Sequence, residues 1–262
     1  MNEQEASMFI KPYAHAAKVV APERAKVRRA GHRDFWWRYG ESRPAMRRAL
    51  APLKRCVVTP KVAKHRLFLW VDTRILISQQ FYVFAKDDDT CFGILHSRFH
   101  EVWAISQGAR HGDGEDGGRL SYTPSATFET FPFPDGLTPN LPAASYAEEL
   151  RAMAIAEAAR ALVEARNHWL NPADLVETVP EVVPGFPDRI LPRNAAAAQA
   201  LRARTLTKLY NTRGTPEGAW LDGLHQRLDE AVAAAYGWPA NITEEDAVAA
   251  LLALNLARPA AV

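Results

Sequence analysis

The sequence predicts an α+β protein in which a mixed α/β part precedes an all-helical part. Short runs rich in Val, Leu, Phe and Tyr, bounded by turn residues, predict strands between residues 55 and 85. Beyond residue 143 the chain is rich in Ala, Glu and Arg, with apolar residues at helical spacing. We therefore expect a first domain over 1–135 with a basic helical lead-in, a linker over 136–142 and a helical domain over 143–262.

The lead-in is expected to consist of helices that precede the strands. Residues 2–30 are predicted to be helical, with Pro12 and Pro22 marking helix starts or breaks. Ser42 stands two residues before a proline, a pattern that favours an N-cap with Pro in the first helical turn. A short helix is therefore expected to begin there and to end near Leu50.

The remaining elements follow from periodicity and turn residues. Strands are predicted at 55–59, 66–71 and 79–85. Apolar residues from Phe92 onward recur at helical spacing, which predicts one amphipathic helix that ends at Gly108. Residues 111–118 are rich in Gly and Asp and are predicted to form a loop, and residues 123–134 are predicted to be extended between prolines. Further helices are predicted at 146–170, 195–210, 220–236 and 244–256.

The net charge of +2 hides a strong asymmetry along the chain. Residues 1–66 hold 16 Lys and Arg against 5 Asp and Glu, whereas the net charge is −5 over 67–142 and −4 over 143–262. Such a block is either a solvated surface or the contact for a polyanion. Aromatic residues within it, at 35–37 and 39, favour nucleic acid. The cations expected to contact phosphates are Arg24, Arg28, Arg29, Lys61, Lys64 and Arg66.

Composition argues against several classes of protein. The apolar fraction of 48% suffices for a core, but no apolar run approaches the length that spans a bilayer. The polar start MNEQEAS is not a signal peptide, so a cytoplasmic location without membrane contact is expected. Cys56 and Cys91 lack the spacing of a metal finger, and their thiols are expected to stay reduced.

Three local patterns have alternative interpretations. His96 and His100 stand four residues apart and could ligate a metal, but Ser97 occupies the position where the zincin motif has its glutamate. The acids Asp87–Asp89 could hold Mg²⁺, or they could satisfy the start of the following helix. Residues 112–117 formally match G-x-G-x-x-G, but they carry three acids and follow a helix, which excludes a dinucleotide site.

Several longer motifs resemble one family. They are RCVVTPKVAKHRLFLW (55–70), KDDDTCFGILHSRFHEVWA (86–104), YTPSATFETFPFP (122–134), RTLTKLYNTR (204–213), AVAAAYGWP (231–239) and LLALNLAR (251–258). As a set they are similar to the target-recognition region and the C-terminal helical region of MmeI-like (type IIL) restriction-modification proteins. The FPFP sequence also resembles the end of the recognition domains in type I specificity subunits.

The resemblance implies a role in recognising DNA. Members of the family are adenine-N6 DNA methyltransferases that use S-adenosylmethionine, often with an N-terminal nuclease. The catalytic Asn-Pro-Pro-Phe/Tyr tetrapeptide has no counterpart here, because the nearest approach, Asn171-Pro172-Ala173-Asp174, follows the recognition region and lacks the second proline and the aromatic. No catalytic residue, metal site or cofactor site is therefore carried over to this chain.

The expected function is sequence-specific binding of double-stranded DNA for a methyltransferase domain or subunit supplied upstream. Base recognition is expected mainly in the 106–123 loop and the 61–66 turn. The loop supplies the candidate base contacts Gln107, Arg110, Arg119 and Tyr122. Two alternatives remain open. One is a self-contained metal-dependent enzyme acting on nucleic acid through Asp87–Asp89, His96 and His100, and the other is a non-catalytic RNA- or protein-binding module.

Overall fold

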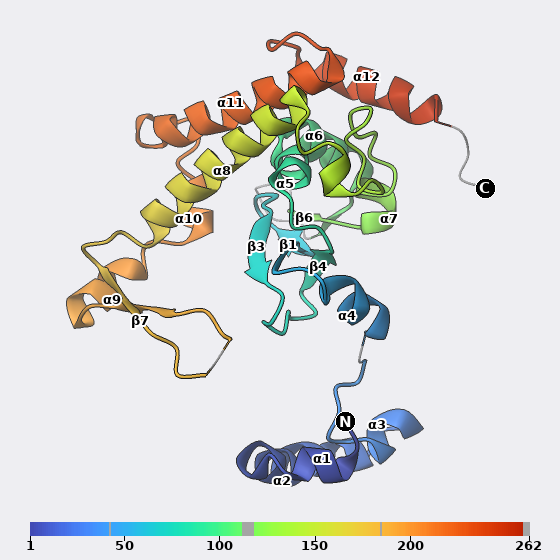
Figure 1. The fold of residues 1–262 in the computed structure, drawn as a ribbon, viewed down its shortest axis with the longest axis vertical. Helices are drawn as coiled ribbons and strands as arrows, with labels where there is room; N and C mark the ends of the chain where they lie inside the picture. Colours follow the sequence, from blue (N-terminus) through green and yellow to red (C-terminus); the bar gives the residue numbers. More distant parts are fainter. Residues whose placement is uncertain (42, 112–117, 184, 259–262) are drawn as a thin grey trace. The chain divides into compact units, whose positions relative to one another are not determined.

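The computed structural model describes residues 1–41, 43–111, 118–183 and 185–258. The described residues form helices and small antiparallel sheets, which confirms the predicted α+β class (Figure 1). Contacts between residues divide the chain into two compact units, Met1–Pro52 and Leu53–Val262.

Short helices and one longer helix make up the described part of the first unit. They are α1 (Glu3–Ser7), α2 (Ile10–Ala25), α3 (Ala30–Asp34) and α4 (Pro44–Leu50). Asn2 and Glu5 form a capping box at the start of α1, so that each side chain accepts a hydrogen bond from the other's backbone N–H. Pro12 lies in the first turn of α2, where its missing N–H costs little, whereas Pro22 lies inside that helix.

The start of α4 differs from the sequence prediction. The N-cap residue is Arg43, in the left-handed region at φ 46, and no side chain caps the helix there. The predicted cap, Ser42, lies outside the described residues. Pro44 opens the helix as predicted, because its fixed φ suits the first helical position.

A three-stranded antiparallel sheet organises the start of the second unit. Its central strand β1 (Arg55–Pro60) pairs with β3 (Leu69–Asp72) on one side and β4 (Phe81–Phe84) on the other. Val57 lies opposite Trp70 of β3 and Phe84 of β4. The buried run from 56 to 59 explains why β1 holds the centre, and the three predicted strands are confirmed with shifted ends.

A second small sheet joins segments far apart in the sequence. Its strands are β2 (Val62–Ala63), β6 (Arg119–Ser121) and β5 (Arg110–His111), in that spatial order. Val62 pairs with Ser121, and the backbone N–H of Tyr122 donates to the Lys61 carbonyl at 2.8 Å. The turn after β1 is thereby fixed against the segment near residue 120.

The predicted helix over 92–107 is wrong in one respect, since it is two helices. They are α5 (Asp89–His96) and α6 (Arg98–Gln107), and a one-turn helix, α7 (Pro124–Thr127), lies further along the chain. Ser97 has an extended backbone at ψ 158 and separates α5 from α6. Their spacing of four residues had suggested that His96 and His100 share one helical face. They do not, because they lie on different helices.

The C-terminal half is mainly helical. Its elements are a 3₁₀ turn (Ala143–Ser145), α8 (Leu150–Leu170), β7 (Val176–Val179), β8 (Arg189–Pro192), α9 (Ala195–Leu201), α10 (Leu206–Tyr210), a 3₁₀ turn (Pro216–Gly218), α11 (Ala219–Tyr236) and α12 (Glu244–Leu256). The β7–β8 hairpin was not predicted, because its side chains are largely exposed and lack the buried alternation of a strand. The helix predicted over 195–210 divides in two, and the Thr205 side chain caps α10.

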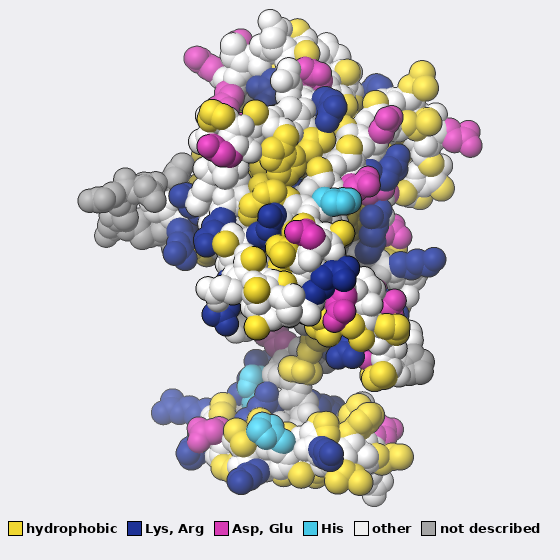
Figure 2. Space-filling model, turned by 90° about the vertical axis from the view of Figure 1, so that its left-hand side faces the viewer, with side chains coloured by type: hydrophobic (Ala, Val, Ile, Leu, Met, Phe, Trp, Pro, Cys, Tyr) yellow, Lys and Arg dark blue, Asp and Glu magenta, His cyan; other side chains and the backbone are white. Residues whose placement is uncertain are grey.

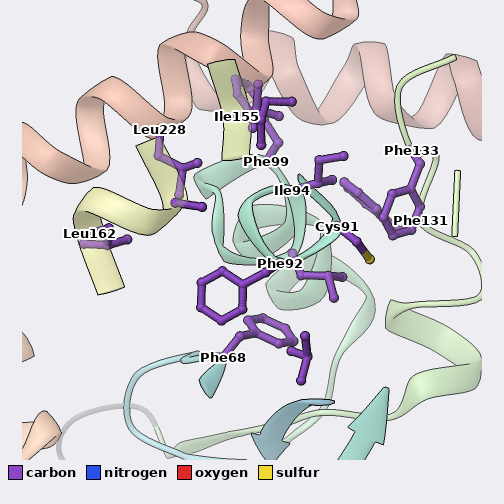
Figure 3. Packing of buried hydrophobic residues seen from close by; sticks show 14 of the residues in the cluster. Phe68, Cys91, Phe92, Ile94, Phe99, Phe131, Phe133, Ile155, Leu162 and Leu228 are labelled. Atoms are coloured by element: carbon purple, nitrogen blue, oxygen red, sulfur yellow. The ribbon is translucent and has the colours of Figure 1, made fainter. Parts of the chain in front are cut away.

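One hydrophobic core lies around α5, between the β3-β1-β4 sheet and the helices α8 and α11 (Figures 1 and 3). Gly93 permits this packing, since a Cβ there would lie 2.6 Å from the Ile155 side chain of α8. Phe92 and Ile94 thus share a core with Leu162 and Leu228 from beyond residue 142. The domain boundary predicted at 136–142 stays a prediction, and side chains from both sides of it pack in one hydrophobic core.

Candidate nucleic-acid interface

The structure brings the two segments predicted to contact DNA into one small sheet. The turn over 61–66 includes β2, and the predicted base-reading segment over 106–123 includes β5 and β6. Antiparallel pairing of β2 with β6 places them side by side. Residues 112–117, which connect β5 to β6, lie outside the described residues. A surface built from these two segments is the candidate interface.

Arg66 anchors the turn from within. Its side chain is 6% exposed. The guanidinium donates hydrogen bonds to Thr59 Oγ1 at 3.0 Å, to the Leu120 carbonyl at 3.0 Å and to the Pro60 carbonyl. Burial lowers the pKa of Arg66 to about 10, so it remains charged at neutral pH. This placement does not fit the expected phosphate contact, because the donors of Arg66 are directed to carbonyl and hydroxyl oxygens inside the protein.

Tyr122 is likewise a core residue, at 1% exposed. Its hydroxyl hydrogen-bonds His100 Nε2 at 3.0 Å, and the Arg66 guanidinium lies 5.0 Å from its ring centre. Burial raises the pKa of Tyr122, and burial together with the charge of Arg66 lowers the pKa of His100 to about 3. His100 is therefore neutral at physiological pH. The expected base contact by Tyr122 does not fit its burial. Tyr122 instead packs with His100 and Arg66 in the interior behind the turn.

Other predicted residues of this surface are exposed. Lys64 is exposed, and Lys61 is half-buried with its ammonium 5.3 Å from the Tyr82 ring centre. Gln107 ends α6 and Arg119 begins β6, and both side chains are exposed. The backbone of Arg110 pairs with Leu120, whereas its side chain lies outside the description. Lys61, Lys64, Gln107 and Arg119 are thus placed where a polyanion could reach them.

The remaining predicted phosphate contacts lie in the first unit. Arg24 is half-buried and donates to the Arg38 carbonyl, whereas Arg28 and Arg29 are exposed near the end of α2. Figure 2 shows Lys and Arg side chains of this unit, in its lower part, beside exposed hydrophobic ones. The exposed apolar side chains include Met8, Phe9 and Ile10. The N-terminal unit therefore offers both cations and apolar surface.

The residues of the alternative metal site have structural partners. The Asp88 side chain caps α5 by accepting from Cys91 N at 2.7 Å, and Asp89 pairs with Arg55 at 2.8 Å. These contacts agree with the helix-start interpretation of the acids. Within the described ranges no group of three or more His, Cys, Asp or Glu side chains is placed to hold a metal ion. Both cysteines are buried and free, and no helix among the described residues is long and apolar enough to cross a membrane.

Sequence reasoning missed the residues that flank the turn on its other side. His65 Nε2 lies 2.8 Å from Asn211 Oδ1, which follows α10. Arg213 stands two residues further along and pairs with Asp222 of α11 at 2.9 Å. Asn211 and Arg213 belong to the RTLTKLYNTR motif, so the signal was present, but it indicated family resemblance and no particular site.

Comparison with known proteins adds one likeness of fold. No protein-family profile and no curated protein matches the sequence. The fold is similar to that of MmeI. This type IIL restriction-modification enzyme was solved in complex with DNA, and the likeness has a TM-score of 0.55 at 21% identity. It covers 93% of this chain and 26% of that enzyme, so this chain spans about a quarter of the enzyme's length. At this identity the comparison shows a shared fold, which agrees with the resemblance seen in the sequence motifs.

Proposed function

We propose that this chain is the DNA-recognition portion of a site-specific adenine methyltransferase of the MmeI-like restriction-modification kind. The observation that carries the proposal is the fold that 93% of the chain shares with an enzyme solved in complex with DNA. The motifs over 55–134 support the same class, because they resemble the target-recognition region of that family. The partner is double-stranded DNA, bound in a fixed register so that a target base can leave the stack.

The positions of the side chains support separate roles in phosphate contact and in base recognition. Phosphate contacts position a protein on the duplex, and contacts to base edges specify the sequence. We assign phosphate contacts to Lys61 and Lys64 of the turn and to Arg28 and Arg29 of the first unit, all of which have exposed or half-buried side chains. We do not assign a phosphate contact to Arg66, because its side chain is buried. Arg24 is a weaker candidate than these four residues, because its guanidinium already donates to the Arg38 carbonyl.

Base recognition is assigned to the segment around β5 and β6. Arg119 has the geometry to donate two hydrogen bonds to a guanine, and Gln107 can pair with an adenine edge. Arg110 stays in this group as a prediction, whereas Tyr122 leaves it because its hydroxyl is engaged inside the core. The methyl transfer and the S-adenosylmethionine site belong, in this proposal, to a domain or subunit outside the chain.

The test measures binding of a mixed-sequence duplex to the full chain by fluorescence anisotropy across a salt series. Affinity should fall about tenfold between low and physiological salt if two phosphates are contacted, and by more if all four assigned cations contact phosphates. The double variant Lys61→Ala with Lys64→Ala should bind weakly and with a flatter salt dependence. Arg227→Ala is a matched control, because Arg227 is exposed on α11 and lies about 200° around that helix from the side that bears His225.

Two further measurements complete the test. A single-stranded oligonucleotide of equal length should bind less tightly than the duplex, and the reverse preference would favour the RNA-binding alternative. Incubation of the chain with labelled S-adenosylmethionine and duplex should give only background incorporation. A salt dependence that the double variant leaves unchanged would remove the turn from the DNA contact.

A further inference from the structure

A pocket of about 580 Å³ opens beside the turn. Its exposed wall includes Lys64 from the turn, together with Asn211 and Arg213 from the segment after α10. Its buried wall includes His96 and His225, which are 6% and 4% exposed. The turn, α5, α10 and α11 therefore meet around one polar cavity that the sequence did not predict.

A buried cation lies directly behind this cavity. Arg166 of α8 is 2% exposed, and its Nη1 lies 2.9 Å from Nε2 of His96 in the pocket wall. Its Nη2 donates to the Phe68 carbonyl at 3.3 Å, whereas its buried Nε has no hydrogen-bond partner among the described residues. No carboxylate of the described chain forms an ion pair with Arg166. A buried guanidinium without a counterion is unfavourable, so it favours a site that receives negative charge.

The buried wall contains more hydrogen-bond donors than acceptors. The Tyr210 hydroxyl oxygen accepts from Arg166 Nη1 at 3.3 Å and lies 3.1 Å from His96 Nε2 and 3.0 Å from His225 Nε2. The Phe68 N–H lies 3.2 Å from His96 Nδ1, and Arg166 Nη1 lies 2.9 Å from His96 Nε2. These two donors face one neutral imidazole, which can accept at only one of its nitrogens.

The electrostatics of the two histidines agree with this arrangement. Burial and the charge of Arg166 lower the pKa of His96 well below its usual range. Burial, followed by the charges of Arg213 and Arg166, lowers the pKa of His225 to about 3. Both rings are neutral hydrogen-bonding groups in a region of positive potential. An acceptor with negative charge is the ligand that complements such a wall.

We infer that this pocket binds a phosphate group, with Lys64 and Arg213 contacting its oxygens and His225 donating from the buried wall. The positive charge of Arg166 acts through His96 and Tyr210, so Arg166 is a positioning residue. Phosphate oxygens of this kind belong either to a DNA backbone or to a free phosphate compound. In the first case the inference rests on the proposed function and extends the phosphate contacts beyond the turn.

Two carboxylates also line the pocket and bear on the inference. Asp222 is engaged by Arg213 Nε at 2.9 Å and by the backbone N–H of Gly214 at 2.7 Å. Glu101 has no side-chain hydrogen bond among the described residues, and burial raises its pKa. Glu101 is the group that opposes an anion most directly. Replacing Glu101 therefore distinguishes two kinds of ligand. The change should strengthen binding of a phosphate and weaken binding of a ligand that needs an acceptor, such as a base edge or a cation.

The experiment titrates the full chain with inorganic phosphate at constant ionic strength, with chloride as the control anion. Binding is followed by calorimetry and by the imidazole NMR signals of His225 and His96. Lys64→Ala and Arg213→Ala should each weaken phosphate binding by about tenfold, as expected for the loss of one charge-assisted hydrogen bond. Glu101→Gln should strengthen it, and Arg227→Ala should leave it unchanged.

A second arm repeats these variants with a short duplex. Parallel losses in both arms identify the DNA backbone as the source of the phosphate, whereas losses with phosphate alone identify a free phosphate compound. Wild-type binding of phosphate without any binding of duplex would overturn the proposed function and keep this site. The phosphate site would be overturned if the imidazole NMR signals of His225 do not shift with phosphate, or if Glu101→Gln binds phosphate more weakly. The proposed function would then be tested by the duplex binding of the turn variants alone.

Arg166→Met adds a test of the buried cation. It should weaken phosphate binding by about tenfold or more while leaving the Lys64 and Arg213 side chains in place. Thermal unfolding checks that this variant is folded. If it is not, Glu101→Gln with the two surface variants decides the question, because none of those three changes removes a buried hydrogen-bonded partner.

Discussion

Replacing Arg66 by methionine separates a buried structural cation from one that we propose to contact DNA. The structure assigns Arg66 to the interior of the turn and Lys64 to its surface. Both cations were predicted from sequence to contact phosphates. The variants Arg66→Met and Lys64→Ala therefore compare the effects on stability and on DNA binding of two cations that stand two positions apart.

The magnitude follows from the contacts of Arg66. Its loss leaves the buried Thr59 hydroxyl and the half-buried Pro60 and Leu120 carbonyls without their side-chain donor, and an unsatisfied buried group costs about 1–3 kcal/mol. Removal of a desolvated charge offsets part of this cost, since methionine needs no hydrogen bonds. We expect the free energy of unfolding to fall by about 2–4 kcal/mol. Lys64→Ala, at an exposed position, should change it by less than about 0.5 kcal/mol.

The assay combines urea unfolding, followed by tryptophan fluorescence, with duplex binding across a salt series. The logarithmic salt slope should be unchanged in Arg66→Met and should fall by about 0.9 in Lys64→Ala, the value for one phosphate contact. Affinity itself can fall in Arg66→Met because the turn is less well held, but the slope reports the number of contacts. A variant with wild-type stability and a reduced slope at Arg66 would refute the buried assignment.

Three further predictions concern the core, pH and base recognition. Gly93→Ala should lower stability by about 1–3 kcal/mol because its Cβ would lie 2.6 Å from a side chain of α8, whereas Gly223→Ala, which has open space in α11, should raise stability by about 0.5–1 kcal/mol. Equal effects in urea unfolding would contradict the packing described. The pKa of His100 is about 3 in the folded state because of burial, and near 6.5 when unfolded, so the unfolded chain binds the extra proton between these values. Stability should therefore fall as the pH is lowered from 7 toward 4, and His100→Gln should lose this component; identical pH profiles would argue against a buried neutral ring. Arg119→Ala and Gln107→Ala should each relax preference at one base pair by about 1–3 kcal/mol in selection from random duplexes. Unchanged selected sites in both variants would place base recognition elsewhere.

The sequence was informative wherever a local pattern decides structure. Strand positions in β1, β3 and β4 followed from short apolar runs between turn residues, and α8, α11 and α12 followed from helical spacing. The predictions failed where a local pattern continues through a break. Ser97 divides the helix expected to run from residue 92 to Gly108, and nothing in its immediate neighbours is a strong breaker. The exposed β7–β8 hairpin was missed because its strands bury too little to show alternation.

The candidate site shows the same division at the level of single residues. Charge counting identified Lys61, Lys64 and Arg66 as one group, yet Arg66 is buried whereas Lys64 is exposed. The sequence could not separate them, because strand pairing of β2 with β6 places the Leu120 carbonyl where Arg66 can reach it. Tyr122 was predicted to contact a base because of its hydroxyl. The same pairing of β2 with β6 accounts for the burial of its ring in the core.

By itself, then, the sequence determined the α+β class, the basic first quarter of the chain and the motifs that resemble a DNA-recognition region, because each depends on residues that are close together in the chain. Only the tertiary structure decided which cations are exposed and which residues converge. His96, Arg166, Tyr210 and His225 come from four helices, and no spacing in the sequence relates them. Burial and hydrogen bonding depend on how helices and strands pack across the whole unit, and this packing turns dispersed polar residues into one cavity.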